Sequence, residues 1–508
     1  MKMILDLPDE IYVLIAENLN TRVIYSCVRV CRSFYSSFIP RLWSDLSIKQ
    51  YRHDDAIDPA IVRTNAHRVE SVNYSSTLVE EYYTIIYPRL HTIRLDTLRT
   101  DEREPTYLQV TPPQKVQFAR HHPTIRKLTS YHKDTLPKEF WEVVETEWKE
   151  LESLEMSGVV DADAVNTFWR VCDRLQNLYF SDLNLPETLP DLSTLSFRRL
   201  RNLKVIKKYH WPKNLSHQLW PVQLLEQVKR SDKLRRLSWD VDGLAFPARM
   251  VLEALEEGYW EELCEFSIGD KCCSDQNLAA ILGALTSRRL TCFELMSGKL
   301  GPLTYRCLQG RYFGHLRDLT IARCGGVTSA MVQEIMVGCV HLVGLDAPHI
   351  FVQDIVRATK PWGCLRLQSL VVYIAKQAGD EPGWDGQVFE QISKLRRLHI
   401  LDVQRDPHYS YLDEETRPDG IMTLETLDYR LNRGAVEKDI RCWSSLVQLR
   451  EFSFDGDRQT LGMDELVWMA EHWRDLWCVT GGFRGIQGDD NCAKRDRIVR
   501  QAGIWVYD

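Results

Sequence analysis

The sequence predicts an α/β solenoid, in which a curved parallel β-ladder carries helices on its convex side, preceded by a small domain of three helices. Two observations lead to this prediction. The pattern Leu-x-x-Leu-x-Leu recurs through most of the chain, and the first 48 residues show helical patterns outside that repeat. A chain of 508 residues is also long for one compact core, which favours a repeat array or several domains.

The first segment, residues 1–48, is expected to form the three helices. Pro8 suits the first turn of a helix, where its missing N–H costs nothing. The apolar residues that follow are spaced to share one helical face: Ile11, Leu14, Ile15 and Leu19. The pattern over 22–38 has an expected buried set of Val23, Ile24, Cys27, Val30, Cys31 and Phe34. So small a unit must either cap the repeats or present its apolar surface to another protein.

The repeat is weak at Leu90 and Ile125, and a last weak copy stands at Leu476. Clear copies begin at residues 151, 175, 200, 234, 263, 290, 316, 342, 367, 395, 424 and 449, and from 263 onward they recur every 25–29 residues. Helical patterns lie between them, as over 274–289 and over 327–339, where Ser329 is expected to cap the helix. A strand and a helix at this period are typical of leucine-rich repeats.

Each strand is predicted to bury its first, fourth and sixth positions between the strand and helix layers. The third, fifth and seventh positions point to the concave face, where a protein substrate would bind. For any one of these residues the alternative is an ordinary solvated strand position. The candidates chosen on this face are Tyr179, Lys204, Arg236, Asp240, Tyr373, Arg397 and His399.

The fourteen cysteines are scattered, and no CxxC pair completes a zinc site. Cys172, Cys339 and Cys364 each precede a motif leucine by three residues, and Cys324 is the ninth residue of its repeat. The copies resemble the cysteine-containing class of leucine-rich repeats, which implies buried, reduced thiols. The pair His121–His122 lacks a third ligand at metal spacing. We therefore expect no metal and no cofactor.

Domain boundaries follow from these patterns. We expect a helical domain over 1–48, a linker and N-terminal capping region over 49–89, a solenoid over 90–482 and a C-terminal cap or tail over 483–508. Insertions rich in charge, proline or aromatic residues fall near 96–120 and 207–223. Insertions in a solenoid collect on one face and often contact partners, although each is equally explained as a tolerated surface loop.

Composition and motifs exclude several functions. The formal net charge of −7 gives no reason to expect nucleic acid as a partner, and the absence of a long apolar run gives none for a membrane. No secretory signal is visible, so we expect a cytoplasmic or nuclear location. Phosphate-binding, zinc-protease and nucleophile-elbow motifs are missing, and the glycine-rich stretch 481–490 reads as a turn. The chain is expected to be no enzyme, with no catalytic residues.

The N-terminal segment resembles the F-box. "LPDEIYVLIAENL", "CVRVCRSFYSSF" and "LWSDL" follow the order and spacing of that family's loose pattern over residues 4–48. The resemblance implies a substrate receptor of an SCF-type cullin-RING ubiquitin ligase, whose F-box binds a Skp-type adaptor and, through it, cullin and RING subunits. By the same resemblance the candidate adaptor-binding residues are Leu7, Pro8, Ile11, Leu14, Ile15, Val30, Cys31, Leu42 and Trp43. The last four match later positions of the family pattern, some of which are core rather than interface, and the sequence alone does not separate these roles.

A second function stays open at this point. The chain could be a leucine-rich-repeat scaffold or a GTPase regulator, whose N-terminal helices only cap the solenoid. The position of Ile11 and Ile15 discriminates the two hypotheses, since a capping helix would pack this face on the first repeats. The identity of the protein substrate cannot be read from the sequence.

Overall fold

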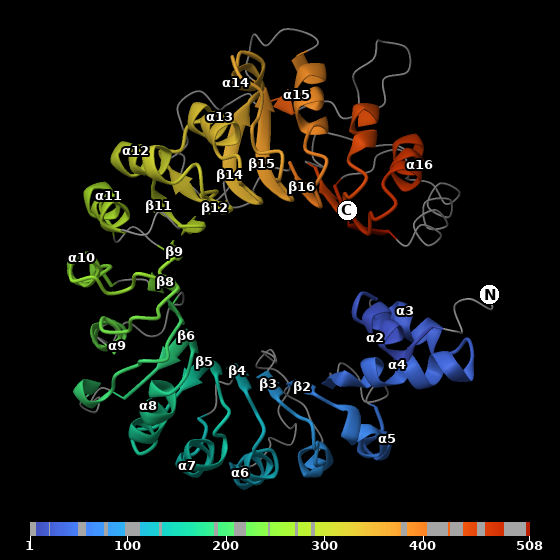
Figure 1. The fold of residues 1–508 in the computed structure, drawn as a ribbon, viewed down its shortest axis with the longest axis vertical. Coiled ribbons are helices and arrows are strands. Elements are labelled where there is room, and N and C mark those ends of the chain that lie inside the picture. Colours follow the sequence, from blue (N-terminus) through green and yellow to red (C-terminus); the bar gives the residue numbers. More distant parts are fainter. Residues whose placement is uncertain are drawn as a thin grey trace, which may run out of the picture. The chain divides into compact units, whose positions relative to one another are not determined.

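A computed structural model describes residues 7–19, 21–48, 57–75, 80–96, 112–131, 135–186, 192–207, 220–241, 244–269, 273–285, 290–376, 384–403, 425–426, 440–454, 463–481 and 504–507. The chain divides into two compact units, Met1–Leu234 and Arg235–Asp508. In each unit the strands lie on one side and the helices on the other (Figure 1). This arrangement confirms the predicted α/β solenoid.

The first unit begins with three helices, α2 (Asp9–Glu17), α3 (Thr21–Cys27) and α4 (Arg32–Ser44). Its strands pair in parallel and in chain order. They are β1 (Asp45–Ile48), β2 (Ser71–Ser75), β3 (Thr92–Asp96), β4 (Lys127–Tyr131), β5 (Ser153–Val159), β6 (Asn177–Asn184) and β7 (Asn202–Lys207). The helical elements between and after them are α5 (Pro59–Asn65), η2 (Ala66–Arg68), η3 (Glu80–Thr84), α6 (Pro112–His121), α7 (Lys138–Glu147), α8 (Val165–Asp173), η4 (Leu192–Thr194) and α9 (Trp220–Val228).

The second unit repeats the same plan. Its parallel ladder runs through β8 (Arg236–Val241), β9 (Glu265–Ile268), β10 (Cys292–Leu295), β12 (Asp318–Thr320), β14 (Gly344–Phe351), β15 (Ser369–Lys376), β16 (Ile400–Asp402), β18 (Glu451–Ser453), β19 (Cys478–Thr480) and β20 (Trp505–Tyr507). A small side sheet pairs β11 (Gly298–Lys299) with β13 (Cys324–Gly325). The helical elements are α10 (Ala248–Glu256), α11 (Asp275–Ala284), α12 (Pro302–Arg311), α13 (Ser329–Gly338), α14 (Val352–Val356), α15 (Trp384–Ser393), η8 (Ile440–Ser445) and α16 (Met463–His472).

The core lies between the strand and helix layers, as the repeat pattern predicts. In the repeat that starts at Leu175, the first, fourth and sixth positions are Leu175, Leu178 and Phe180, and all three are buried. The cysteines that precede a motif leucine by three residues and the cysteine at the ninth position of its repeat are buried as well: Cys172, Cys324, Cys339 and Cys364. Burial raises the pKa of the last three thiols to about 12, so they remain protonated apolar fillers at neutral pH.

The ladder extends beyond the bounds that the sequence suggests. β1 pairs with β2 from Asp45 to Ile48, and β2 pairs with β3, so strands form well before residue 90. At the other end, β20 pairs with β19 inside the expected tail. These short strands lack the full leucine pattern, and pairing with a neighbour in the ladder decides their conformation. Most of the two expected insertions lies outside the described residues, although α6 and α9 begin within their bounds.

Two repeat assignments are corrected by the register. "LETLDY" at 424 is not a ladder strand, because β16 pairs directly with β18, whereas β17 (Glu425–Thr426) pairs antiparallel with β15. In the preceding repeat Ser369 pairs with Ile400, so the motif begins at Leu398 rather than at Leu395. "LRRLHI" and "LHILDV" both fit the pattern, and only the hydrogen-bonded ladder chooses between them.

Helix α13 shows a smaller correction. Its N-cap is Thr328, whose hydroxyl accepts a hydrogen bond from the N–H of Met331 at 3.2 Å. Ser329 is buried, and its hydroxyl instead accepts a hydrogen bond from the N–H of Phe351 at 2.7 Å. Ser329 therefore joins its helix to the following strand. Among the described residues, no helix is long and apolar enough to cross a membrane.

Candidate adaptor-binding and substrate-binding surfaces

The N-terminal helices pack around a small aromatic core. Tyr12, Ala16, Ile24 and Phe38 are buried in it. The rings of Tyr12, Phe34 and Phe38 meet edge to face, with centroids 5.5–6.0 Å apart. Pro8 begins α2, and its carbonyl accepts the first helical hydrogen bonds. The side of α2 that carries Tyr12 and Ala16 therefore builds the domain.

The other side of α2 is apolar and exposed. Ile11, Leu14 and Ile15 expose 38%, 54% and 36% of their surface, and Val13 adds a further exposed side chain. A helix that buried these residues against the first repeats would not leave them exposed. An apolar face of this kind on a small domain is typical of a protein-binding surface.

The remaining adaptor candidates divide between surface and core. Pro8 and Val30 are exposed, and Cys31 and Trp43 are half-buried. Leu7 and Leu42 pack against the aromatic core. The expected burial of Val23 and Val30 is wrong, since both are exposed. Aromatic residues on α2 and α4 supply the core in their place.

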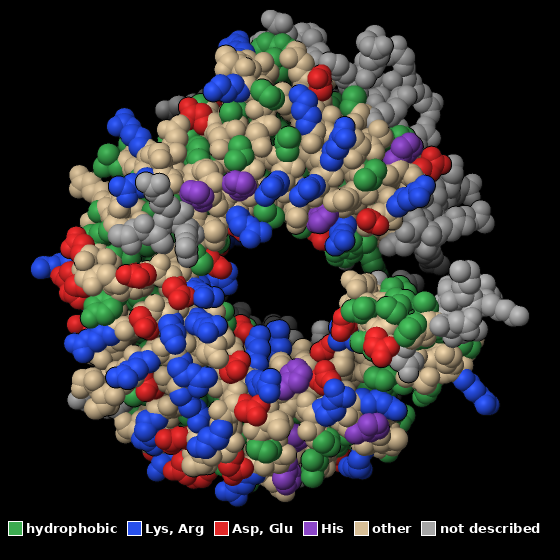
Figure 2. Space-filling model, viewed as in Figure 1, with side chains coloured by type: hydrophobic (Ala, Val, Ile, Leu, Met, Phe, Trp, Pro, Cys, Tyr) green, Lys and Arg blue, Asp and Glu red, His purple; other side chains and the backbone are tan. Residues whose placement is uncertain are grey.

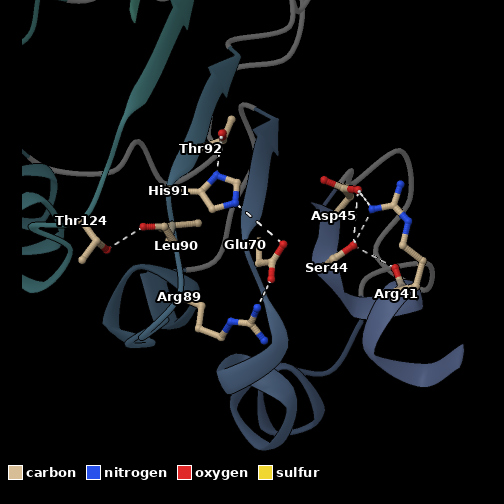
Figure 3. Close-up of polar contacts among 9 residues, drawn as sticks. All are labelled: Arg41, Ser44, Asp45, Glu70, Arg89, Leu90, His91, Thr92 and Thr124. Carbon is tan, nitrogen blue, oxygen red and sulfur yellow. Dashed lines mark hydrogen bonds and ion pairs between the residues drawn. The ribbon is translucent and has the colours of Figure 1, made fainter. Parts of the chain in front are cut away.

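Helix α4 runs directly into the first strand of the ladder. Ser44 ends the helix, Asp45 begins β1, and the carbonyl of Ser44 accepts a hydrogen bond from the N–H of Glu70. Arg41 donates to the carboxylate of Asp45 at 2.9 Å and to the hydroxyl of Ser44 (Figure 3). The end of the N-terminal segment thus pairs directly with β2, which lies in the region expected to form a linker and cap.

Two of the substrate candidates lie on the first unit. Tyr179 on β6 and Lys204 on β7 occupy paired positions in the ladder. Both are half-buried. The structure therefore brings these two candidates side by side on one strand face.

Three candidates lie on strands of the second unit. Arg236 on β8 is exposed and forms an ion pair with Glu265 of β9. Asp240 is only 4% exposed, because the backbone at Gly269 closes over it: a Cβ built on Gly269 would lie 1.8 Å from the Asp240 carboxylate. Tyr373 is 8% exposed, since β14 continues alongside it and pairs it with His349. The expected outward exposure of Asp240 and Tyr373 is therefore wrong.

The last two candidates are displaced by the corrected register. His399 directly follows the motif leucine, and Arg397 directly precedes it, so neither lies at a third or fifth strand position. Arg397 is exposed and His399 half-buried. Both lie in the turn that leads into β16 rather than on its face.

The histidine pair has a structural use. His122 donates from Nδ1 to the carbonyl of Phe118 at 2.8 Å, and Nε2 accepts from the N–H of Tyr87 at 3.0 Å. Burial lowers the pKa of His122 to about 4, so the ring is neutral at physiological pH. Within the described residues no group of three or more His, Cys, Asp and Glu side chains is placed to hold a metal ion.

Comparison with known proteins bears on the N-terminal helices. Residues 4–49 match the family described as F-box-like. The N-terminal domain is F-box-like. The chain thus combines an F-box-like domain with a leucine-rich-repeat solenoid, and the exposed apolar face of α2 belongs to the F-box-like domain.

Solved structures that match this chain include the Rad7 and Elc1 complex in yeast, at 12% identity over 74% of this chain and 91% of that chain, with a TM-score of 0.42. Another is the leucine-rich repeat domain of APL1B, at 11% identity over 94% of this chain and 93% of that chain, with a TM-score of 0.19. A search of curated protein sequences found no significant match.

Three residues of the F-box-like domain were not predicted from the sequence, one in its core and two on its surface. Tyr12 is the centre of the F-box-like core, and Val13 and Tyr25 are exposed apolar residues beside the predicted ones. The helical period of α2 contains the signal for Tyr12 and Ala16, which are four residues apart on one face. Two apolar faces on one short helix compete in such a pattern, so the sequence cannot say which face is buried.

Proposed function

We propose that this chain is a non-catalytic substrate-recognition subunit of an SCF-type cullin-RING ubiquitin ligase. The F-box-like domain binds a Skp-type adaptor, and through it the cullin and RING subunits, while the repeats hold the target protein. Catalysis belongs to the partner enzymes. The observation that carries the proposal is the exposed apolar face of Ile11, Leu14 and Ile15 on a domain that matches the F-box-like family.

The capping hypothesis accounts for only part of the domain. Leu46 and Ile48 on β1 are buried, so the end of the N-terminal domain does cover the first strand of the ladder. The α2 face contributes nothing to that cover. Its exposed aliphatic side chains would cost little to remove from water on binding, and burying them stabilises a complex by roughly 25 cal/mol per Å² of apolar surface.

Co-elution with a purified Skp-type adaptor tests the proposal. Wild-type protein should form a complex at micromolar concentration, and the double variant Ile11→Asp with Ile15→Asp should weaken it by about a hundredfold or more, because two charges would be buried. The matched control is Ile61→Asp with Ile86→Asp, which changes two more exposed isoleucines of the first repeats and should leave binding unchanged.

Two results would contradict the proposal. Failure of the wild-type chain to bind the adaptor at micromolar concentration would leave the scaffold or GTPase-regulator hypothesis in its place. Equal loss in both double variants would show that binding does not use the α2 face. Circular dichroism of each variant separates lost binding from lost folding.

A further inference from the structure

A recurring ion pair marks the turns that lead into the strands. The residue after the first motif position of one repeat pairs with the residue before that position in the next. Arg126 meets Glu150 at 2.8 Å in this way, and Arg235 meets Glu262 at 2.7 Å. At the start of the ladder, Glu70 pairs with Arg89 (Figure 3). Each pair links neighbouring repeats along one edge of the ladder.

Several consecutive repeats of the second unit lack the acidic member, which returns only at the last pair of positions, Arg450 and Asp475. Arg317 holds the first position of such a pair, but the partner position is His341. Gln368 holds the first position of a later pair, and Arg397 holds the partner position in the next repeat. Arg366 is also exposed at the position before its motif leucine. In the part of the chain that the structure describes, no carboxylate lies within ion-pair distance of these three arginines.

These positions, together with the neighbouring Arg396, form one continuous band, which we call the basic rim: Arg317, His341, Arg366, Arg396 and Arg397. The rim follows four consecutive strands, β12, β14, β15 and β16. Figure 2 shows Lys, Arg and His side chains gathered along the strand side of these repeats. Strands about 4.8 Å apart make the rim about 14 Å long, the span of about four extended residues. It is basic although the chain carries a net charge of −7.

Exposed apolar side chains accompany the charges. Val340 and Leu365 directly precede His341 and Arg366, and they expose 47% and 52% of their surface. Val447 has the same relation to its repeat and is 55% exposed. A phosphate backbone would leave these side chains uncovered, whereas a peptide can place carboxylates on the arginines and aliphatic side chains on the apolar row.

We propose that the basic rim binds an extended acidic segment of a partner protein. Its carboxylates take the positions that Glu70, Glu150 and Glu262 hold in other repeats, and its apolar side chains contact Val340 and Leu365. Bidentate pairing of arginine with carboxylate fixes the direction and register of the segment. The assignment of this segment to the protein that the ligase ubiquitinates rests on the function proposed above.

The test uses the full chain and a fluorescent peptide of about eight residues in which glutamate pairs alternate with leucine. Fluorescence anisotropy should show binding that weakens as salt rises. The variant Arg366→Glu with Arg397→Glu should bind about tenfold or more weakly, because two attractions become repulsions. The control, Arg306→Glu with Arg323→Glu, makes the same charge change at exposed positions outside the rim and should bind as wild type.

Further probes separate the possible occupants. A peptide with glutamine in place of glutamate should bind far more weakly, and equal binding would overturn the role of charge. A short single-stranded oligonucleotide that bound more tightly than the peptide would assign the rim to nucleic acid instead. No peptide binding at about 1 mM would refute the proposal. The rim variant should keep the Skp-type adaptor, and the Ile11→Asp, Ile15→Asp variant should keep the peptide, so the two proposals can fail separately.

Discussion

Single residues in this chain acquire their roles from contacts with neighbouring repeats. His122 directly follows α6, and it uses one ring nitrogen on the carbonyl of Phe118 in that helix and the other on the backbone of Tyr87, 35 residues earlier. Asp240 occupies a strand position that should face outward, yet it is buried where Gly269 lets the next turn approach. The residue types suggested a possible metal ligand for His122 and an outward-facing charge for Asp240. Contacts with the adjacent repeat determine the role of both residues.

His122 gives a pH dependence whose sign is fixed. Its pKa is near 6.5 in the unfolded chain and about 4 in the folded chain, so the unfolded state binds more protons between these values. The free energy of unfolding should therefore fall as pH drops from about 6.5 to about 4, by up to about 3 kcal/mol. Thermal unfolding of the wild type and of His122→Gln between about pH 4 and pH 6.5 measures how the free energy of unfolding changes with pH. The variant keeps an acceptor for Tyr87 and should show a shallower slope; parallel slopes would contradict the prediction.

At the scale of elements, helix α12 begins with help from the preceding repeat. The Asp275 carboxylate lies at the start of α11, but it accepts hydrogen bonds from the N–H groups of Leu303 and Thr304, at 3.0 and 2.9 Å, in α12. Gly301 makes room for it, because a Cβ there would lie 2.1 Å from the carboxyl carbon. One side chain thus ties two repeats together and satisfies two free N–H groups at a helix terminus.

Asp275→Ala should destabilise the second unit by about 1–2 kcal/mol, since it removes the cap of α12. Hydrogen exchange of segment 302–311 should quicken more than exchange elsewhere in the repeats. Asp275→Asn keeps one acceptor and should lose less. Asp232→Ala, at an exposed aspartate, is the control and should stay within about 0.5 kcal/mol of wild type. Unchanged exchange in α12 would show that Gly301 alone positions the helix.

At the scale of the molecule, the F-box-like domain and the first repeats form one continuous structure. Helix α4 ends at Ser44, β1 begins at Asp45, and four residue pairs join β1 to β2. An adaptor that binds α2, as proposed above, would therefore be held at a defined position relative to the first repeats. The basic rim belongs to the other unit, so adaptor and substrate segment are assigned to separate parts of the chain.

Leu46→Asp tests this continuity. Leu46 is 6% exposed and pairs with Val72, so a carboxylate there would be buried in the ladder and should cost about 3 kcal/mol or more. Hydrogen exchange should rise together in 32–48 and 71–75, whereas Ser47→Asp, at an exposed position on the same strand, should change neither. Faster exchange in β2 with an unchanged α4 would indicate that the two parts are not coupled.

The sequence alone determined the solenoid, the buried leucine positions, the cysteine fillers and the F-box resemblance, because each depends on a periodic or local pattern that one repeat already contains. Only the tertiary structure decided which face of α2 is buried, that the ladder begins at Asp45, that the motif before β16 starts at Leu398, and that "LETLDY" leaves the ladder. These features depend on pairing between repeats. A three-residue shift preserves the leucine pattern, whereas hydrogen bonds between strands allow one register. The basic rim was hidden for the same reason, since its residues are neighbours only across strands.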